Sequence, residues 1–574
     1  MQDCLTVFLK KYFCKLILSC KLFFKSRLIE FRSQYKIWAK ASLPYLGIFI
    51  ALAACYNTVF RYGYAHHDEV NFFLYGKTYI LHSVRLFVLS MGRFIGAYIA
   101  TGLNYLVNSL FDLKVTRFFM IVQLWISACI LMRWLKSHFL SKRDAFLFSV
   151  ALFTLPSFEI MASFAAGFNN STGVWMGLLS GVLAFGMSIE GTILSRIKSK
   201  SFIFSVIFFI LGLMAYQPSA VIFWIIPALV ILFSSLDKFE ETKQRLINIF
   251  VSGFFALGIY FLILQVFKKM LSQIAGGYNP YSLSTDYFGK IYWFFSEAVS
   301  NCLNFWNVFP KSLYVVLASV FIGFLTLVIL TLRIKRAQES KEVKSISIKI
   351  IILSSVFLSC LFLSFLPNLL STGNFAFYRC LSGPATIILA LLVWGIWRMT
   401  QILKFQSRNV FSLLLAILMI FGLLRAHHNV FRYIVFPGYI EMDVMKNVLR
   451  NEFETYKRIH IIHADQDKLK TYYDEFGLVS SSMAQNRLGL VSGGYTEIFK
   501  QDNMFLYGIL FDFDLQEAEF LFVRNDDRES GLAFKKIITS SAKKLKTPFD
   551  EPTLVIDMTR LYKTGAPLEY LLIP

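Results

Sequence analysis

The sequence has little charge for its length. Asp, Glu, Lys and Arg make up 16% of its 574 residues, whereas hydrophobic residues make up 56% and the mean hydropathy is +0.57. Soluble globular proteins have about 25% charged residues. The composition therefore excludes an ordinary soluble domain and indicates an integral membrane protein.

Several motifs of soluble enzymes and pumps are also missing. The chain has no GxxxxGK[ST] loop, no GxGxxG after a strand and no GxSxG elbow, which argues against nucleotide-driven transport and serine hydrolysis. Its eight cysteines form no CxxC pair and lie mostly within or beside apolar runs. They predict neither a zinc site nor a disulfide framework.

The formal charge of +22 comes from short basic segments between apolar runs. This spacing follows the positive-inside rule of membrane proteins and does not predict a nucleic acid partner. Residues 1–40 carry nine Lys or Arg against two acids, with no short apolar core before a small-residue cleavage site. We expect a cytoplasmic, basic amphipathic arm there, not a cleaved signal peptide.

Apolar runs predict a polytopic α-helical bundle of about eleven transmembrane helices within residues 41–426. The predicted spans are 43–60, 116–135, 145–160, 171–189, 202–216, 219–235, 247–267, 313–332, 350–366, 384–398 and 409–425. Tyr216-Gln217-Pro218 is expected to join two of these helices in a tight hairpin.

The basic loops set the predicted orientation. With residues 1–40 inside, the basic segments between later spans also fall inside, as long as 91–110 is a surface-lying or re-entrant helix. The outer side then receives loops 61–115 and 268–312, a turn near 370–384 and the tail 427–574. Within this tail, apolar runs shorten to strand length at 458–463, 519–523 and 553–557, which predicts a small extramembrane α/β domain.

The outer loop 61–115 contains His66-His67-Asp68-Glu69 just after the first span. A carboxylate at this surface can act as a general base or metal ligand, although an acidic pair can also be merely solvated. Metal ligation by the two histidines is disfavoured because adjacent side chains diverge and neither has an HxxxH or HxH partner. The sequence leaves the metal unknown.

Three arginines are predicted at the outer interface: Arg85, Arg93 and Arg379. Each can snorkel to lipid phosphates or clamp a specific phosphate. Arg379 precedes a span on the side opposite the basic loops, against the orientation bias, which indicates a use for it.

Polar groups also occur at outer helix ends. Asn169-Asn170-Ser171-Thr172 and Tyr216-Gln217-Pro218 can hydrogen-bond sugar hydroxyls, or simply cap helices and form a turn. Glu159, expected near the outer end of its helix, is a secondary site candidate.

Four motifs occur in a characteristic order: His67-Asp68-Glu69, Met91-Gly92-Arg93-Phe94, Tyr216-Gln217-Pro218 and Tyr378-Arg379. In this order the chain resembles the polytopic C-type glycosyltransferases, and among them the bacterial O-antigen glucosyltransferases of the serotype-converting Gtr type two family. The resemblance is spread over roughly residues 45–440. It implies hexose transfer, with glucose as the sugar, from a polyprenyl-phosphate donor to a polysaccharide acceptor on the periplasmic side of the inner membrane, as in lipopolysaccharide modification.

The resemblance also implies residue roles. Asp68 corresponds to an essential acid of the first outer loop, with Glu69 beside it as the second catalytic candidate, although the family often has two aspartates here. The residues expected to contact donor or acceptor are His67, Arg85, Arg93, Asn169, Tyr216, Gln217 and Arg379. No organic cofactor is implied, a divalent cation (Mg²⁺ or Mn²⁺) is left open, and membrane lipid is an expected partner.

Two other classes fit the same hydropathy. A transporter or flippase for lipid-linked glycans predicts charges near mid-membrane and repeated halves, and neither is evident. A non-catalytic scaffold with a periplasmic interaction domain requires no outer carboxylate.

Overall fold

The computed structural model describes the chain in segments. These are residues 42–64, 69, 85, 88–107, 110–274, 283–308, 316, 318–325, 343–402, 407–435, 458–463, 536–541, 553–557 and 572–573. The predicted N-terminal arm, His66, His67 and Asp68 lie outside them.

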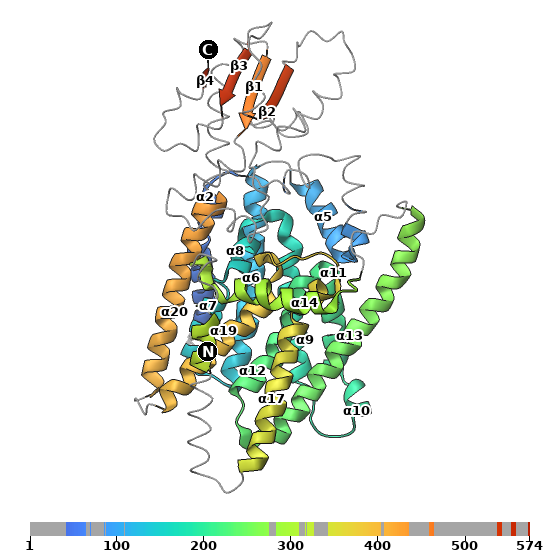
Figure 1. Ribbon diagram of the computed structural model, residues 1–574, viewed down its shortest axis with the longest axis vertical. Helices are drawn as coiled ribbons and strands as arrows, with labels where there is room; N and C mark the ends of the chain where they lie inside the picture. Colours follow the sequence, from blue (N-terminus) through green and yellow to red (C-terminus); the bar gives the residue numbers. More distant parts are fainter. Residues whose placement is uncertain are drawn as a thin grey trace, which may run out of the picture. The chain divides into compact units, whose positions relative to one another are not determined.

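Long apolar helices dominate the described residues (Figure 1). The long helices are α6 (Leu110–His138), α9 (Phe168–Phe185), α11 (Lys200–Ala220), α13 (Phe239–Ile274), α17 (Val343–Leu363), α19 (Ser382–Ile402) and α20 (Ser407–Asn429). Shorter ones are α2 (Thr58–Arg61), α5 (Phe94–Leu106), α7 (Lys142–Leu152), α8 (Pro156–Ser163), α10 (Ile193–Ile197), α12 (Ile225–Phe233), α14 (Tyr287–Trp293), α15 (Ser300–Leu303) and α18 (Leu366–Leu370). Helices suit lipid because they satisfy every backbone polar group internally.

Five described segments are long and apolar enough to cross a membrane. They are Asp112–His138, Lys200–Phe233, Phe239–Phe267, Ser382–Gln401 and Asn409–Asn429. Helices α7 and α8 bend by 67° and would form a sixth if they are one broken span. The protein is thus a helical, membrane-associated protein, and the total of eleven spans stays a prediction.

The predicted hairpin at Tyr216-Gln217-Pro218 is confirmed. Tyr216 leaves the helical conformation, with φ −161° and ψ 106°. The rings of Phe209 and Phe223 then stack with centroids 4.4 Å apart, whereas a straight helix would separate these positions by about 21 Å. The segment Lys200–Phe233 therefore holds two antiparallel arms, α11 and α12, joined through η3 (Val221–Trp224).

Glycines let the backbone of α9 approach this hairpin closely. A Cβ atom on Gly173 would lie 2.9 Å from the Tyr216 carbonyl oxygen, and one on Gly177 would lie 2.2 Å from the Ala220 carbonyl oxygen. Small residues spaced four apart are typical of tight helix contacts in membranes. The polar groups of the core also pair across helices, since Ser205 Oγ lies 2.6 Å from Ser252 Oγ of α13.

Contacts along the helices define two ends of the bundle. Midway along α6, Gln123 Oε1 accepts hydrogen bonds from Ser171 and Thr172 at the start of α9. Near the other end, Trp134 packs on Phe185, so α6 and α9 run parallel. We call the end that holds the starts of α6 and α9 and the Tyr216 hairpin the turn end.

The opposite end, which we call the basic end, carries several paired arginines. Arg196 donates to Gln244 Oε1 at 2.9 Å and Asn248 Oδ1 at 3.2 Å, and Arg245 donates to the Phe185 carbonyl oxygen at 3.0 Å. This distribution agrees with a cytoplasmic basic end, as the positive-inside rule predicts. The sidedness itself stays a prediction.

Helix α5 lies within segment 91–110, which the sequence predicts to be surface-lying or re-entrant. Its 13 residues reach about 20 Å, which is shorter than a hydrocarbon core of about 30 Å. This length agrees with the prediction that the segment does not span the membrane. Asn169 Nδ2 donates to the Gly96 carbonyl oxygen at 3.0 Å, which fixes α5 to the start of α9.

Four short strands are described in the tail. They are β1 (Arg458–His463), β2 (Lys536–Ser541), β3 (Thr553–Asp557) and β4 (Leu572–Ile573), in the order β2-β1-β3-β4. β1 pairs in parallel with β2 and β3, whereas β3 and β4 are antiparallel. β1 and β3 coincide with two predicted strand segments, and the third lies outside the described residues. The α/β domain as a whole stays a prediction.

Replacing Gly177 by alanine tests the close approach of α9 to the hairpin. We expect Gly177→Ala to cost about 1–3 kcal/mol, because the added methyl group meets backbone, which cannot move aside like a flexible side chain. Thermal unfolding in detergent measures the effect. Gly258→Ala is the matched control, since a Cβ atom there meets nothing within 4 Å. Equal melting temperatures of the two variants would contradict this packing.

Candidate functional site

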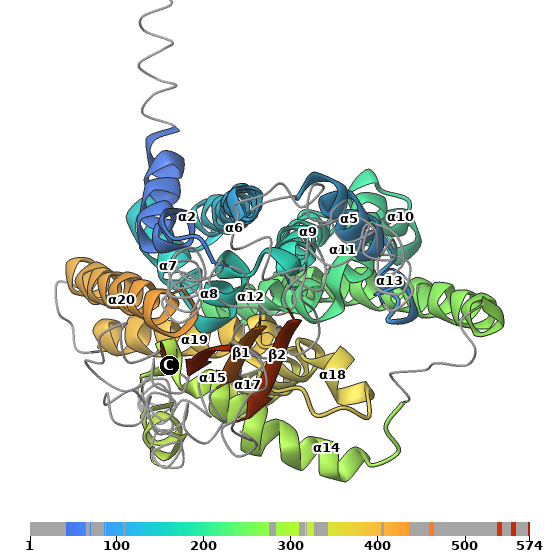
Figure 2. The ribbon, with the colours of Figure 1, turned by 90° about the horizontal axis from the view of Figure 1, so that it is seen from above.

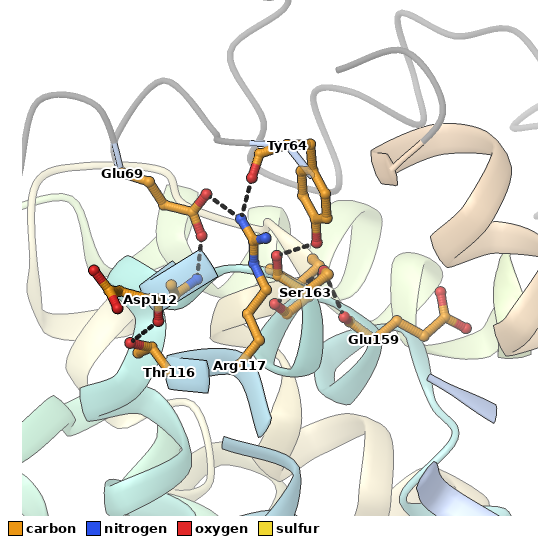
Figure 3. A network of polar contacts seen from close by, with 9 residues as sticks. Tyr64, Glu69, Asp112, Thr116, Arg117, Glu159 and Ser163 are labelled. Carbon is orange, nitrogen blue, oxygen red and sulfur yellow. Dashed lines mark hydrogen bonds and ion pairs between the residues drawn. The ribbon is translucent and has the colours of Figure 1, made fainter. Parts of the chain in front are cut away.

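A buried ion pair joins Glu69 to α6. Arg117, near the start of α6, and Glu69 both have fully buried side chains, and Arg117 Nη2 lies 2.5 Å from Glu69 Oε2 (Figure 3). The other carboxylate oxygen, Oε1, accepts a hydrogen bond from the backbone N–H of Ala165. Burying a carboxylate without such partners is strongly unfavourable. Both oxygens of Glu69 are therefore engaged in holding the structure.

Tyr64 extends this anchor. Its carbonyl oxygen accepts from Arg117 Nη2 at 3.0 Å, and the guanidinium carbon lies 3.7 Å from its ring centroid. The phenol donates to the Ser163 carbonyl oxygen at 2.6 Å. Burial raises the pKa of the Tyr64 phenol, which keeps this donor protonated. Tyr64 and Glu69 are thus fixed to α6, α8 and the turn that follows α8.

A second cluster joins two predicted motifs. Arg93 Nε donates to Gln217 Oε1 at 3.0 Å, and the Arg93 guanidinium carbon lies 4.3 Å from the Tyr216 ring centroid. Gln217 Nε2 in turn donates to the Met91 carbonyl oxygen and to Tyr260 Oη, both at 2.6 Å. The segment Met91-Gly92-Arg93 and the hairpin at Tyr216 therefore meet at the turn end.

Gly92 is required by this geometry. Its φ of +76° lies in the left-handed region that favours glycine. A Cβ atom would also lie 2.1 Å from Leu264 Cδ2 and 2.8 Å from Tyr260 Oη. Tyr260 donates to the Gly92 carbonyl oxygen at 3.1 Å, so the backbone at Gly92 is part of the cluster.

The fourth motif reaches the same cluster through η8 (Tyr378–Cys380). Cys380 Sγ lies 3.6 Å from Tyr216 Oη. Arg93 and Arg379 are both close enough to the Tyr216 phenol to interact with it electrostatically. Two half-buried arginines near one phenol suit an anion such as a phosphate, because guanidinium groups make strong charge-assisted hydrogen bonds with phosphate oxygens.

Two predicted site residues lie at the edge of this arrangement. Asn169 is 9% exposed, and its Oδ1 atom has no hydrogen-bond partner within the described part of the chain. Arg85 stacks over Tyr98 of α5, with the guanidinium carbon 5.0 Å from the ring centroid. Arg85 makes no described contact with the Arg93–Gln217 cluster.

Glu159 belongs to a third polar cluster. Asn429 Nδ2 donates to both of its carboxylate oxygens at 3.2 Å and to the Trp306 carbonyl oxygen at 2.8 Å. In Figure 3 the Glu159 carboxylate points away from the Glu69–Arg117 pair. Among the described residues, no basic side chain lies within 4 Å of the fully buried Glu159 carboxylate.

The backbone beside Glu159 is strained. Trp306 and Asn307 have φ values of 57° and 51°, a region that costs non-glycine residues about 1–3 kcal/mol each. Asn307 Oδ1 accepts from the Tyr378 phenol at 3.3 Å. The Glu159 cluster is therefore linked to Tyr378, the neighbour of Arg379.

Several of these residues are not among the site residues predicted from the sequence. Arg117, Tyr260 and Asn429 each lie in or beside an apolar run, and such polar groups carry a signal because they need a partner inside the bundle. In the described ranges, no three His, Cys, Asp or Glu side chains are grouped so that they could hold a metal ion. Asp68 and His67 lie outside those ranges, so their predicted roles stay predictions.

The comparisons with known proteins add no relative. No family model, no curated protein and no solved structure matches the chain. The resemblance to C-type glycosyltransferases therefore depends on the four motifs alone.

Removing either partner of the buried ion pair should destabilise the protein. We expect Arg117→Met or Glu69→Leu to lower the free energy of unfolding by about 3–5 kcal/mol, because each leaves an unpaired buried charge. The double variant should recover part of this loss, because it buries no charge. Unfolding of the two single variants and the double variant in detergent measures this double-mutant cycle. If the free-energy losses of the single variants simply add in the double variant, the two residues are not coupled.

Proposed function

We propose that the protein is a membrane hexosyltransferase that moves a hexose, glucose by resemblance, from a polyprenyl-phosphate donor to a polysaccharide. One observation supports this above the others. Three motifs more than 100 residues apart in the sequence converge at the turn end, through Arg93, Gln217 and Cys380, the residue that follows Tyr378-Arg379. The same end holds the acidic first loop through Glu69 and Arg117.

Arg93 is suited to hold the donor phosphate. Its Nε atom is committed to Gln217, which fixes the plane of the guanidinium group. Its two terminal nitrogens make no hydrogen bond with the described residues. They can therefore donate parallel hydrogen bonds to phosphate oxygens. Arg379, near the same Tyr216 phenol, supplies a second positive charge. The isoprenoid tail of the donor would remain among the apolar helices.

The two acids of the first loop receive different roles. Glu69 is a positioning residue, because Arg117 and Ala165 occupy its oxygens. We assign the general base to its neighbour Asp68. Asp68 would take the proton of the acceptor hydroxyl as that oxygen attacks the anomeric carbon. The bond between this carbon and the phosphate oxygen breaks, and polyprenyl phosphate leaves.

The finer architecture is part of the same proposal. Eleven spans, a cytoplasmic basic end and a periplasmic turn end would place the reaction on the outer face of a bacterial inner membrane. The tail 427–574 would then be periplasmic. A divalent cation at Asp68 is left to the experiment.

Sugar transfer in membranes tests the assignment of the two acids. With labelled polyprenyl-phosphate glucose, we expect Asp68→Asn to lower the transfer rate by about 10²–10⁴-fold, as loss of a general base does. Glu69→Gln should mainly reduce the amount of folded protein and change the rate per folded molecule far less. Glu190→Gln, an exposed acid at the basic end, is the control. A chelator arm reports any metal, and full transfer by Asp68→Asn would contradict the assignment.

Donor affinity tests the role of Arg93. We expect Arg93→Gln to raise the KM for the donor by roughly tenfold to a hundredfold, because a hydrogen bond to a charged group contributes about 1.5–3 kcal/mol. The exposed Arg133→Gln on α6 should leave KM unchanged. Steady-state kinetics with a fixed acceptor measures both variants. An unchanged KM in Arg93→Gln would remove the proposed phosphate site.

A further inference from the structure

A row of aromatic and aliphatic side chains lies exposed on α14 and the π-helical turn that follows it, η5 (Phe294–Val299). The exposed fractions are 63% for Tyr287, 88% for Phe288, 45% for Ile291, 76% for Tyr292 and 44% for Phe295. These positions follow the spacing of one helical face. Soluble surfaces rarely gather so many large apolar groups, so this face needs a partner.

The opposite face of the same segment is firmly packed. Phe294 is fully buried, and its ring stacks on Phe362 of α17 with centroids 5.0 Å apart. Lys290 is 6% exposed and donates to the Gly373 carbonyl oxygen at 2.8 Å and Asn374 Oδ1 at 2.6 Å. The exposed row is therefore held outward by contacts on the other side.

The segment 283–303, which we call the strap, also binds the chain before Arg379 at its two ends. Near its start, the backbone N–H of Ser284 donates to the Leu370 carbonyl oxygen at 2.8 Å. Near its end, Asn301 Nδ2 donates to the Ala376 carbonyl oxygen at 3.0 Å. Together with Lys290, these contacts fix residues 370–376, just ahead of Arg379.

The surroundings of the exposed row favour lipid as its partner. The neighbouring helix α17 exposes Ile348, Ile351 and Leu358 by 51%, 64% and 46%, which continues the apolar surface. In Figure 2, which looks down on the bundle, α14 runs across the view at the periphery, whereas α6 is seen nearly end-on. Tyrosine and phenylalanine on a helix that lies across the spans are typical of the membrane interface.

We propose that the exposed face of α14 inserts into the lipid interface and that the strap thereby positions the Arg379 segment. The lipid contact stands on the observations above alone, whereas its consequence for phosphate binding by Arg379 rests on the proposed function. The exposed face of α14 would contact the interfacial region of the lipid bilayer. A second copy of the chain is an alternative that the test excludes.

Fluorescence quenching in vesicles tests the lipid contact without any activity. A polarity-sensitive label on Phe288→Cys should be quenched strongly by lipids that carry a spin label high on the acyl chain, and weakly by aqueous iodide. Glu190→Cys, exposed at the basic end, should show the reverse, and wild-type protein gives the background from native cysteines. Iodide quenching of Phe288→Cys would overturn the proposal by showing water there. Quenching by neither reagent would overturn it by showing a protein partner.

Hydrogen exchange tests the positioning role. In the same vesicles, Phe288→Asp with Tyr292→Asp should weaken lipid insertion and speed amide exchange in residues 370–380 by about tenfold, because the strap no longer fixes that segment. Helix α7 should exchange as in wild-type protein. Exchange that stays unchanged in 370–380 would contradict the strap, whatever the transfer assay shows.

Discussion

The buried ion pair between Glu69 and Arg117 is the constraint on which the arrangement at the turn end depends. A charge inside an apolar bundle is stable only when it is paired and hydrogen-bonded. Arg117 meets this need by binding both the Glu69 carboxylate and the Tyr64 carbonyl oxygen. Tyr64 and Glu69 are thereby fixed beside α6 and α8.

The rest of the turn end is built from polar side chains that satisfy one another across helices. Gln217 Nε2 connects the hairpin to the Met91 backbone and to Tyr260. Gln217 Oε1 accepts from Arg93 Nε, and this bond orients the guanidinium group. Such interhelical hydrogen bonds are modest individually, but they fix the distances between segments that are far apart in the sequence. The glycines of α9 permit these segments to come close enough.

The sequence predicted the features that depend on local pattern. Apolar runs predicted the long helices that the structure describes, but not the 67° bend between α7 and α8, which interrupts the predicted span 145–160. Pro218 after Tyr216-Gln217 predicted the hairpin, because a proline and a helix break can be recognised within a few residues. The partner of Glu69 could not be predicted from the sequence, because Arg117 is 48 residues away and the pairing depends on how α6 packs against the segment that holds Glu69. The positive φ of Trp306 also carries no local signal, since a bulky residue rarely adopts it, whereas asparagine at position 307 is a residue type that adopts a positive φ more often.

The most direct test of the account is whether the purified wild-type chain, alone in vesicles, moves labelled hexose from polyprenyl phosphate into a polysaccharide acceptor. The account predicts labelled polysaccharide that requires both donor and acceptor, with polyprenyl phosphate released in equal amount. Donor that crosses the bilayer intact, with no label in the acceptor, would contradict it and establish a transporter of lipid-linked sugar instead.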